Sequence, residues 1–386
     1  MSLRLIVLCA AATLAEPMAL YDQAIDAREH RDAQRFTQLT SQLLEYAPRS
    51  PPLHFLHAEA LAMSGRTGPA LAQLRWLATN GYSYAFWERD SFAGLPASET
   101  ATLRAATTKN GAPAGSIARV VRLDRDDLDP EGIETLGQDW IVGSMTNGSL
   151  YRIDRSGVTT LLWQETEPRR RLFGVRHDPQ RNIVWACSNG ADDNHAQPQL
   201  LRIALGPIAA TRWQVPDPRA LCNDIALLPD GAVAISDSQR GAVWQLDPNG
   251  QWRTLAKAGT FGYPNGLTYL AQARQVVVAD LRGLWTIDLA AARVAVIAEQ
   301  ATFSGGIDGL YAAGGELIAI QNGTRPHRVL RIALSSDARR VQRVSAIASN
   351  LEELAAMTTA AVERGTITVL AGSQLVQLVS SDSADD

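Results

Sequence analysis

The sequence predicts a mainly β protein, a six-bladed β-propeller preceded by a small α-helical domain. A pattern of head residue, strand and turn recurs six times after residue 117. The 29 glycines and nine tryptophans, against seven phenylalanines, favour many short turns between strands. Before residue 108 the apolar residues have helical spacing. Hydrophobic residues make up 46% of the 386 residues and charged residues 20%, which is enough material for a packed core.

Each repeat begins with a head, in which a polar or aromatic residue is followed by a small or polar residue and then an apolar one. The heads begin at Glu131, Phe173, Asn223, Asn265, Asp308 and, more weakly, Thr358. They are 42 to 50 residues apart, which is the length of one four-stranded blade. A β-rich core strand follows each head and a third strand comes next, with turn residues between them.

The end of the repeat predicts how the ring closes. The sixth copy ends near Ser380 after three strands, whereas residues 117–123 alternate like a strand that has no blade of its own. We expect this early strand to complete the last blade, because closure leaves no bare sheet edge. The propeller then spans residues 117–380, and residues 381–386 form a disordered acidic tail.

The first 15 residues have the pattern of a signal peptide. Arg4 gives a basic start, residues 5–14 are mostly apolar, and small residues precede Glu16. The apolar run is too short to span a bilayer. We therefore expect an exported protein, periplasmic or secreted, with no transmembrane segment after cleavage.

Residues 17–108 are predicted to form a helical domain, joined to the propeller by a linker at residues 109–116. Small and apolar residues mark one helical hairpin: Ala58, Ala60, Gly65, Ala70, Leu71, Leu74 and Ala78. This spacing resembles a tetratricopeptide repeat. The resemblance implies a groove for a peptide or protein partner, although a purely structural helical cap is the simpler interpretation.

Charge and cysteine content exclude several classes of protein. The formal net charge of −4 does not fit a nucleic-acid-binding surface or a polybasic membrane patch. Three cysteines, at positions 9, 187 and 222, exclude a disulfide scaffold and a thiolate zinc cluster. Cys187 and Cys222 could approach each other, so a disulfide is conceivable, but we expect two buried free thiols.

The heads predict a metal site. The first strand of every blade lines the central channel of a propeller, so the head side chains meet at one face. Glu131, Asn223, Asn265 and Asp308 offer only oxygen atoms, and two carboxylates near the axis are costly to bury without a cation. Hard oxygen ligands favour Ca²⁺, with Mg²⁺ or Mn²⁺ as alternatives. Each residue taken alone has a simpler explanation, because Asn-Gly and Asp-Gly are common turn dipeptides.

The head motifs resemble those of calcium-dependent six-bladed propeller hydrolases: the senescence marker protein (regucalcin)/gluconolactonase family, paraoxonase, diisopropylfluorophosphatase and the strictosidine-synthase-like proteins. The resemblance lies in residues 130–133, 222–231, 263–267 and 306–310. It implies that Glu131, Asn223, Asn265 and Asp308 hold a catalytic calcium. Leu221 replaces the sugar-facing arginine of gluconolactonases, which argues against an aldonolactone substrate. Phe173 and Thr358 stand where paraoxonase-like members carry histidines, which argues against histidine-dependent chemistry.

We therefore expect a calcium-dependent hydrolase of small lactones or esters. The cation would polarise the carbonyl, Asp308 would act as base or nucleophile, and Asp224 would orient water or Asn223. Phe173, Thr358, His195, Arg240, Arg282 and Arg325 are candidate substrate residues at the mouth, where the arginines could steer an anion. Solvated loop charges explain these arginines equally well.

The main alternative is a non-catalytic propeller with a helical repeat, acting as a scaffold or ligand-binding protein of the cell envelope. A quinone-dependent sugar dehydrogenase would share the fold, but no histidine- and arginine-lined cofactor well is evident in the sequence.

Overall fold

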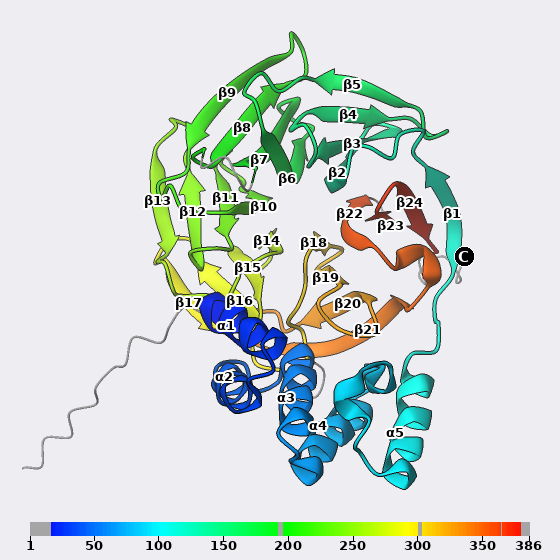
Figure 1. The fold of residues 1–386 in the computed structure, drawn as a ribbon. Coiled ribbons are helices and arrows are strands. Elements are labelled where there is room, and N and C mark those ends of the chain that lie inside the picture. The colour runs from blue at the N-terminus through cyan, green and yellow to red at the C-terminus, as the bar shows by residue number, and fades with distance from the viewer. Residues whose placement is uncertain (1–16, 192–195, 300–302, 364, 380–386) are drawn as a thin grey trace, which may run out of the picture.

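The computed structural model describes residues 17–191, 196–299, 303–363 and 365–379. These residues form six four-stranded antiparallel sheets arranged around a central axis, with five α-helices ahead of them in the chain (Figure 1). The predicted fold class is therefore confirmed. The expected signal peptide and acidic tail lie outside the described residues, and so does His195. None of the described helices is both long enough and apolar enough to cross a membrane.

Each of the first five blades is built from four consecutive strands. Blade 1 contains β2 (Pro130–Leu136), β3 (Asp139–Ser144), β4 (Leu150–Ile153) and β5 (Thr159–Trp163). Blade 2 contains β6 (Arg170–Asp178), β7 (Ile183–Gly190), β8 (Gln199–Ala204) and β9 (Ala209–Gln214). Blade 3 contains β10 (Cys222–Leu227), β11 (Val233–Asp237), β12 (Ala242–Leu246) and β13 (Trp252–Ala256). Blade 4 contains β14 (Leu267–Leu270), β15 (Gln275–Asp280), β16 (Gly283–Asp288) and β17 (Arg293–Val296). Blade 5 contains β18 (Leu310–Ala313), β19 (Glu316–Gln321), β20 (Arg328–Leu334) and β21 (Val341–Ser349).

The sixth blade closes the ring with a strand from the start of the propeller. Its own strands are β22 (Met357–Glu363), β23 (Thr366–Ala371) and β24 (Gln374–Leu378), and the short helix η3 (Glu352–Leu354) precedes them. β1 (Ile117–Arg122) pairs antiparallel with β24, with Val121 opposite Leu375. This confirms the predicted closure. It ties the two ends of the propeller together by main-chain hydrogen bonds and leaves no gap in the ring.

The core lies between blades. Six apolar clusters each take side chains from two neighbouring blades; for example, Ile235 of blade 3 packs with Trp185 of blade 2. Each sheet is therefore covered on both faces. The inner strands accordingly read as continuous apolar runs such as Val276–Ala279, in which every side chain is buried, rather than as alternating patterns.

The glycines of the heads permit close packing of neighbouring inner strands. A Cβ on Gly132 would lie 2.4 Å from the carbonyl oxygen of Phe173. One on Gly174 would lie 2.3 Å from that of Asn223, and one on Gly266 would lie 2.6 Å from that of Asp308. These glycines are required by the approach of the next head, because a side chain there would push adjacent blades apart.

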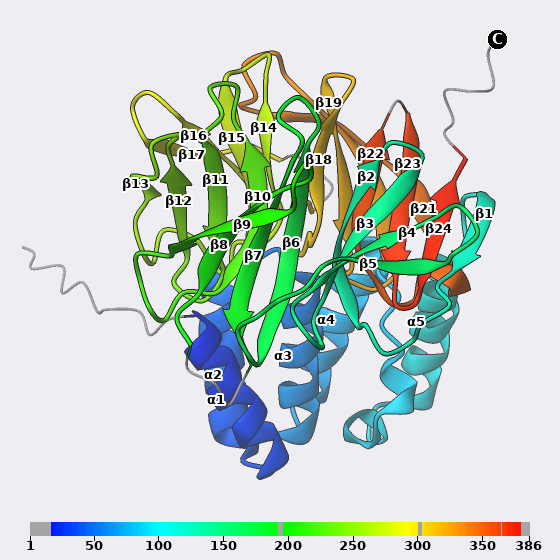
Figure 2. The ribbon, with the colours of Figure 1, turned by 90° about the horizontal axis from the view of Figure 1, so that it is seen from above.

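The helices form a layer against one face of the propeller (Figure 2). They are α1 (Pro17–Glu29), α2 (Ala33–Tyr46), α3 (Pro51–Met63), α4 (Thr67–Thr79) and α5 (Ala97–Asn110), with short helices η1 (Phe86–Glu88) and η2 (Asp90–Phe92) before α5. Two apolar clusters hold the layer together, one around Phe36 and one around Leu74. The predicted linker is partly structured, because α5 continues to Asn110 and Ala114 pairs with Ser349. The resemblance to a tetratricopeptide repeat stays a prediction.

The helical layer contains a polar groove of about 870 Å³. Its lining includes Gln38, Gln42 and Glu45 from α2, together with His57 and Arg66. Binding of a peptide or protein there stays a prediction.

Replacing Gly174 by Ala tests the close packing of the heads. We expect Gly174→Ala to lower the free energy of unfolding by about 3 kcal/mol, because the new methyl group meets a backbone carbonyl. Gly206→Ala is the matched control, since a Cβ there has no atom within 4 Å and should change stability by about 0.5 kcal/mol or less. Urea denaturation measures both. Equal stabilities for the two variants would contradict this packing argument.

Candidate functional site

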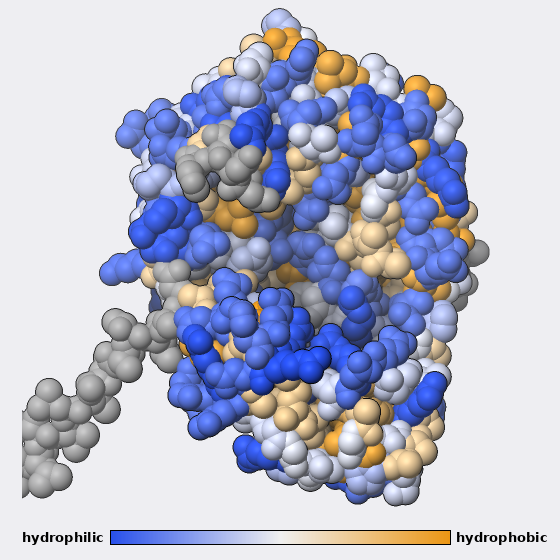
Figure 3. Space-filling view, in the orientation of Figure 1, coloured by the Kyte–Doolittle hydropathy of each residue, from blue (hydrophilic) through white to orange (hydrophobic). Residues whose placement is uncertain are grey.

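All six heads are held at one end of the ring by the same hydrogen bond. In each blade a backbone N–H just beyond the second strand donates to a carbonyl at the start of the head segment, over 2.9 to 3.1 Å. The donor and acceptor pairs are Met145 and Asp129, Ala191 and Arg169, Ser238 and Leu221, Leu281 and Gly262, Gly323 and Gly306, and Gly372 and Ala356. The helical layer contacts the loops at this same end, so the heads lie at the face that it partly covers. Figure 3 shows this face, which is hollowed near the centre of the ring.

Two amide side chains fix the carboxylate of Asp308. Asn265 Nδ2 donates to Asp308 Oδ1 over 2.7 Å, and Asn322 Nδ2 donates to Oδ2 over 2.6 Å. Because a carboxylate accepts hydrogen bonds, Asn265 must turn its nitrogen toward Asp308 and its oxygen away. That oxygen, Asn265 Oδ1, is buried and has no hydrogen-bond partner. An unsatisfied buried acceptor beside a half-buried carboxylate would be stabilised by a positively charged or proton-donating group.

Glu131 brings a second carboxylate to the same place from blade 1. The hydroxyls of Thr358 and Thr359 donate to its backbone carbonyl over 3.2 and 2.6 Å. Burial raises the pKa of the Glu131 carboxyl, and the nearby charge of Asp308 raises it further. Burial also raises the pKa of Asp308, against the opposing effect of its two amide donors. Both residues are half-buried, and the raised pKa values of the two neighbouring carboxyls favour a shared proton or a bound cation.

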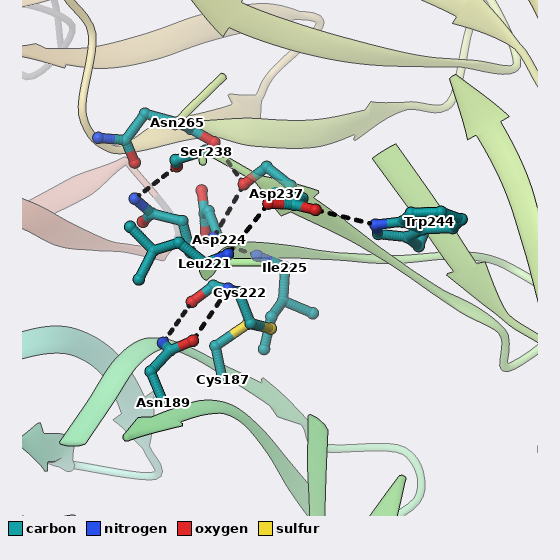
Figure 4. The surroundings of a disulfide bond; sticks show 12 residues. Cys187, Asn189, Leu221, Cys222, Asp224, Ile225, Asp237, Ser238, Trp244 and Asn265 are labelled. Carbon is teal, nitrogen blue, oxygen red and sulfur yellow. Dashed lines mark hydrogen bonds between the residues drawn. A yellow bond between two sulfur atoms is a disulfide. The ribbon is translucent and has the colours of Figure 1, made fainter. Parts of the chain in front are cut away.

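Asn223 is connected to the segment before Asn265 by the hydroxyl of Ser238. Its Nδ2 donates to Ser238 Oγ over 2.9 Å, and Ser238 Oγ donates to the carbonyl of Pro264 over 2.6 Å. This hydroxyl joins the head of blade 3 to the segment that leads into Asn265 (Figure 4). Of the four predicted ligands, the structure thus bonds Asn265 to Asp308, places Glu131 within electrostatic reach of Asp308, and links Asn223 indirectly.

A disulfide fixes the start of the blade 3 head. Cys187 on β7 and Cys222 on β10 are bonded, with their Cα atoms 5.2 Å apart (Figure 4). The expectation of two free thiols was wrong, because adjacent inner strands of blades 2 and 3 bring these residues together although 35 positions separate them. Asn189 reinforces the link: its Nδ2 donates to the Cys222 carbonyl over 2.8 Å, and its Oδ1 accepts from the Cys222 N–H over 3.0 Å.

The donor set fits a hard cation better than a transition metal. Within the described ranges there is no cluster of three or more His, Cys, Asp and Glu side chains that could hold a metal. The predicted set contains two carboxylates and two amides, which are oxygen donors of the kind that Ca²⁺ takes. The unpartnered oxygen of Asn265 supplies a ligand atom that no protein donor satisfies. These residues fit a calcium ion.

Asp224 is bound by donors of the protein itself. It occupies the position that glycine takes in four of the heads, and its carboxylate accepts from the backbone N–H groups of Leu267 and Ile225 over 3.0 and 2.8 Å. The Arg176 guanidinium lies 3.0 Å from its Oδ1. Only 4% of Asp224 is exposed, and its oxygens accept from these protein donors. The expected role of Asp224 in orienting water or Asn223 stays a prediction.

Arg176 ties four blades together near the axis. From blade 2 it also contacts Glu134 of blade 1 over 3.3 Å and donates to the carbonyl of Ile225 in blade 3 over 2.9 Å. Its guanidinium stacks on the Tyr311 ring of blade 5 at 4.7 Å. Arg176 supplies one positive charge to two carboxylates, Glu134 and Asp224, and burial raises the pKa of each.

Sequence reasoning missed Asn322, Arg176 and Tyr263. Asn322 follows the core strand of blade 5, where an amide after an apolar run is a usable signal. Arg176 gives no local signal, because its partners come from distant blades. Tyr263 has a positive φ of 55°. Burial raises the pKa of its phenol, and so do the charges of Asp308 and Glu131, which places the phenol near both.

The predicted mouth residues have partners within the protein. Arg240 pairs with Asp217 at 3.1 Å, and Arg282 bonds Asp280 at 2.6 Å. The carbonyl of Arg325 accepts from Ser83 N–H of the helical layer over 2.9 Å. Phe173 packs against the core cluster between blades 2 and 3. The positive charges of Arg240 and Arg282 are therefore balanced, which weakens their expected role in steering an anion.

Comparisons with known proteins identify the fold. No protein-family description matches the chain, and no curated protein matches it. A putative gluconolactonase structure superposes with a TM-score of 0.51 at 16% identity, covering 70% of this chain and 98% of that one. Virginiamycin B lyase from Staphylococcus aureus gives 0.48 at 12% identity, covering 68% and 98%. The PQQ-bound aldose sugar dehydrogenase from Streptomyces coelicolor gives 0.49 at 15% identity, covering 69% and 98%. At 16% identity, the first of these structures shows a shared fold alone.

The two raised carboxyl pKa values predict a pH-dependent effect of calcium. A carboxyl whose pKa is higher in the folded state binds more protons there, so stability without a cation falls as the pH rises above the unfolded value of about 4. Calcium requires the ionised forms and would offset this loss. The calcium-induced rise in Tm should therefore be larger at about pH 8 than at about pH 5, by thermal unfolding. A calcium-induced rise in Tm that is independent of pH would contradict calcium binding by the carboxyls of Glu131 and Asp308.

Removing the Arg176 side chain should leave the carboxylates of Glu134 and Asp224 without their shared counter-charge. We expect Arg176→Met to lower the free energy of unfolding by about 3–5 kcal/mol, because Glu134 and Asp224 lose their counter-charge. The control Arg343→Met removes a surface ion pair with Glu316 and should cost about 1 kcal/mol or less. Denaturant titrations would decide, and similar losses in both variants would contradict a central role for Arg176.

Proposed function

We propose that the protein is a calcium-dependent hydrolase of small lactones or esters. The observation that carries this proposal is the buried oxygen of Asn265, which has no partner and lies beside the fixed carboxylate of Asp308. Glu131 adds a second carboxylate, so two negative charges would balance one divalent ion. Glu131, Asn223, Asn265 and Asp308 would hold the ion. When bound, calcium would supply Lewis-acid polarisation of the substrate carbonyl. Mg²⁺ and Mn²⁺ are alternative ions.

Asp308 is suited to act as the base or nucleophile. Its two amide partners hold the carboxylate in one orientation, so its reacting oxygen needs no reorganisation. Without a cation burial raises its pKa, and a bound calcium would favour the ionised carboxylate that a base or nucleophile requires. Asn322, which bonds both Asp308 and the carbonyl of Met357, anchors this arrangement to blade 6.

The disulfide supports an exported location, periplasmic or secreted. A bond between Cys187 and Cys222 persists in an oxidising compartment and is rare in a reducing cytosol. This agrees with the signal-peptide pattern at residues 1–15.

The proposed function predicts calcium in the purified protein and turnover that depends on it. Elemental analysis should find about one calcium per chain, and a panel of lactones and aryl esters should include a substrate whose hydrolysis stops with chelator and returns with Ca²⁺. Asp308→Asn should lower kcat by about 100-fold or more. The control Asp22→Asn changes an exposed carboxylate on α1 and should leave kcat unchanged.

Two results would count against the hydrolase. Full activity in Asp308→Asn would remove Asp308 from its role. Absence of bound calcium and of any turnover across the panel would favour the alternative, a non-catalytic scaffold or ligand-binding protein of the cell envelope.

A further inference from the structure

We propose that Tyr46 of the helical layer positions the calcium ligand Asn265 of blade 4. The part of this inference that is tested by calcium titration rests on the proposed function. Tyr46 is the last residue of α2, and its ring lies against Gly262, where the segment Gly262–Asn265 of the blade 4 head begins. The helical layer is thereby part of the site rather than an independent module.

Tyr46 occupies the space that a side chain at position 262 would need. A Cβ on Gly262 would lie 2.5 Å from the Tyr46 hydroxyl oxygen and 2.7 Å from its Cε1. Gly262 is the anchor of this head, because its carbonyl accepts from the Leu281 N–H over 2.9 Å and its N–H donates to Asp280 Oδ2 over 2.9 Å. The phenol ring therefore covers the backbone at the point where the blade 4 head is fixed.

Arg282 connects the ring to the same anchor. Its guanidinium lies between two aromatic rings, 4.9 Å from the centre of Tyr46 and 4.4 Å from the centre of Trp285. The same guanidinium bonds Asp280, the carboxylate that accepts from Gly262. A cation between two rings holds its position by electrostatic attraction and by contact area. This explains why Arg282 lies in the mouth without being available to a substrate.

Two residues, Tyr263 and Pro264, join the anchor Gly262 to the ligand Asn265, and both are constrained. Tyr263 has a φ of 55°, a conformation that a bulky residue keeps only where its surroundings enforce it. The carbonyls of Pro264 and Asn265 accept from the hydroxyls of Ser238 and Ser236 over 2.6 and 2.8 Å. A displacement of Gly262 is therefore passed on to the Asn265 side chain, because the intervening backbone has little freedom to absorb it.

Other contacts hold the layer in place without reaching a head. Arg49 pairs with Glu299 at 3.1 Å, and Ser83 N–H donates to the carbonyl of Arg325 over 2.9 Å. Tyr46 differs from them because its contact is with a residue three positions from a proposed ligand.

The test compares Tyr46→Ala with Tyr46→Phe in the full-length protein, by hydrogen exchange and calcium titration. In Tyr46→Ala the amides of Gly262 and Leu281 should exchange at least about 10-fold faster, since both donate the hydrogen bonds that the ring covers. Calcium binding should weaken by about 10-fold, the effect of disturbing a group that supports a ligand. Tyr46→Phe keeps the ring and should behave as wild type. Tyr21→Ala, which removes a ring that is 38% exposed on α1, should also behave as wild type.

Two further variants, Gly262→Ala alone and combined with Tyr46→Ala, distinguish the proposed contact from a general destabilisation of the helical layer by Tyr46→Ala. Gly262→Ala places a methyl group against the intact ring and should weaken calcium binding. In Tyr46→Ala the space is free, so adding Gly262→Ala should cause no further loss, which is a non-additive result.

Additive losses, or unchanged exchange at Gly262 and Leu281 in Tyr46→Ala, would overturn the inference. Should the wild type bind no calcium at all, the proposed function fails, and the exchange rates alone then decide whether Tyr46 positions this segment.

Discussion

The central constraint is the approach of two half-buried carboxylates, Glu131 and Asp308, at the place where the inner strands of the propeller begin. Such a pair is unfavourable in a low-dielectric interior unless a proton or a cation lies between them. Asn265 and Asn322 hold Asp308 and leave one amide oxygen without a donor. Much of the surrounding structure keeps these groups in place despite their mutual repulsion.

The support comes from three directions. Around the ring, a repeated backbone hydrogen bond fixes the start of each head, and glycines let neighbouring heads approach. Near the axis, Arg176 joins four blades and pairs with both Asp224 and Glu134. At the face that the helical layer partly covers, the disulfide at Cys222 and the ring of Tyr46 hold the heads of blades 3 and 4. Rigid elements of this kind are what a preorganised site needs.

The sequence predicted the parts of the structure that repeat. It did not predict the parts that depend on contacts between residues far apart in the chain. The blades, the closing strand and the head positions could be predicted, because each copy carries the same local pattern of head, strand and turn. The bond between Cys187 and Cys222, the engagement of Asp224 by Arg176, and the stacking of Arg282 on Tyr46 could not. Each of these joins elements whose proximity follows only from the order of blades or from the docking of the helices. The substrate leaves no comparable local signal.

The most direct test is a crystal structure of the protein grown with Ca²⁺. A single strong density peak should lie between the carboxylates of Glu131 and Asp308 and within coordination distance, about 2.3–2.6 Å, of the amide oxygen of Asn265. Density for water alone at that place, or calcium bound only elsewhere on the chain, would contradict the account.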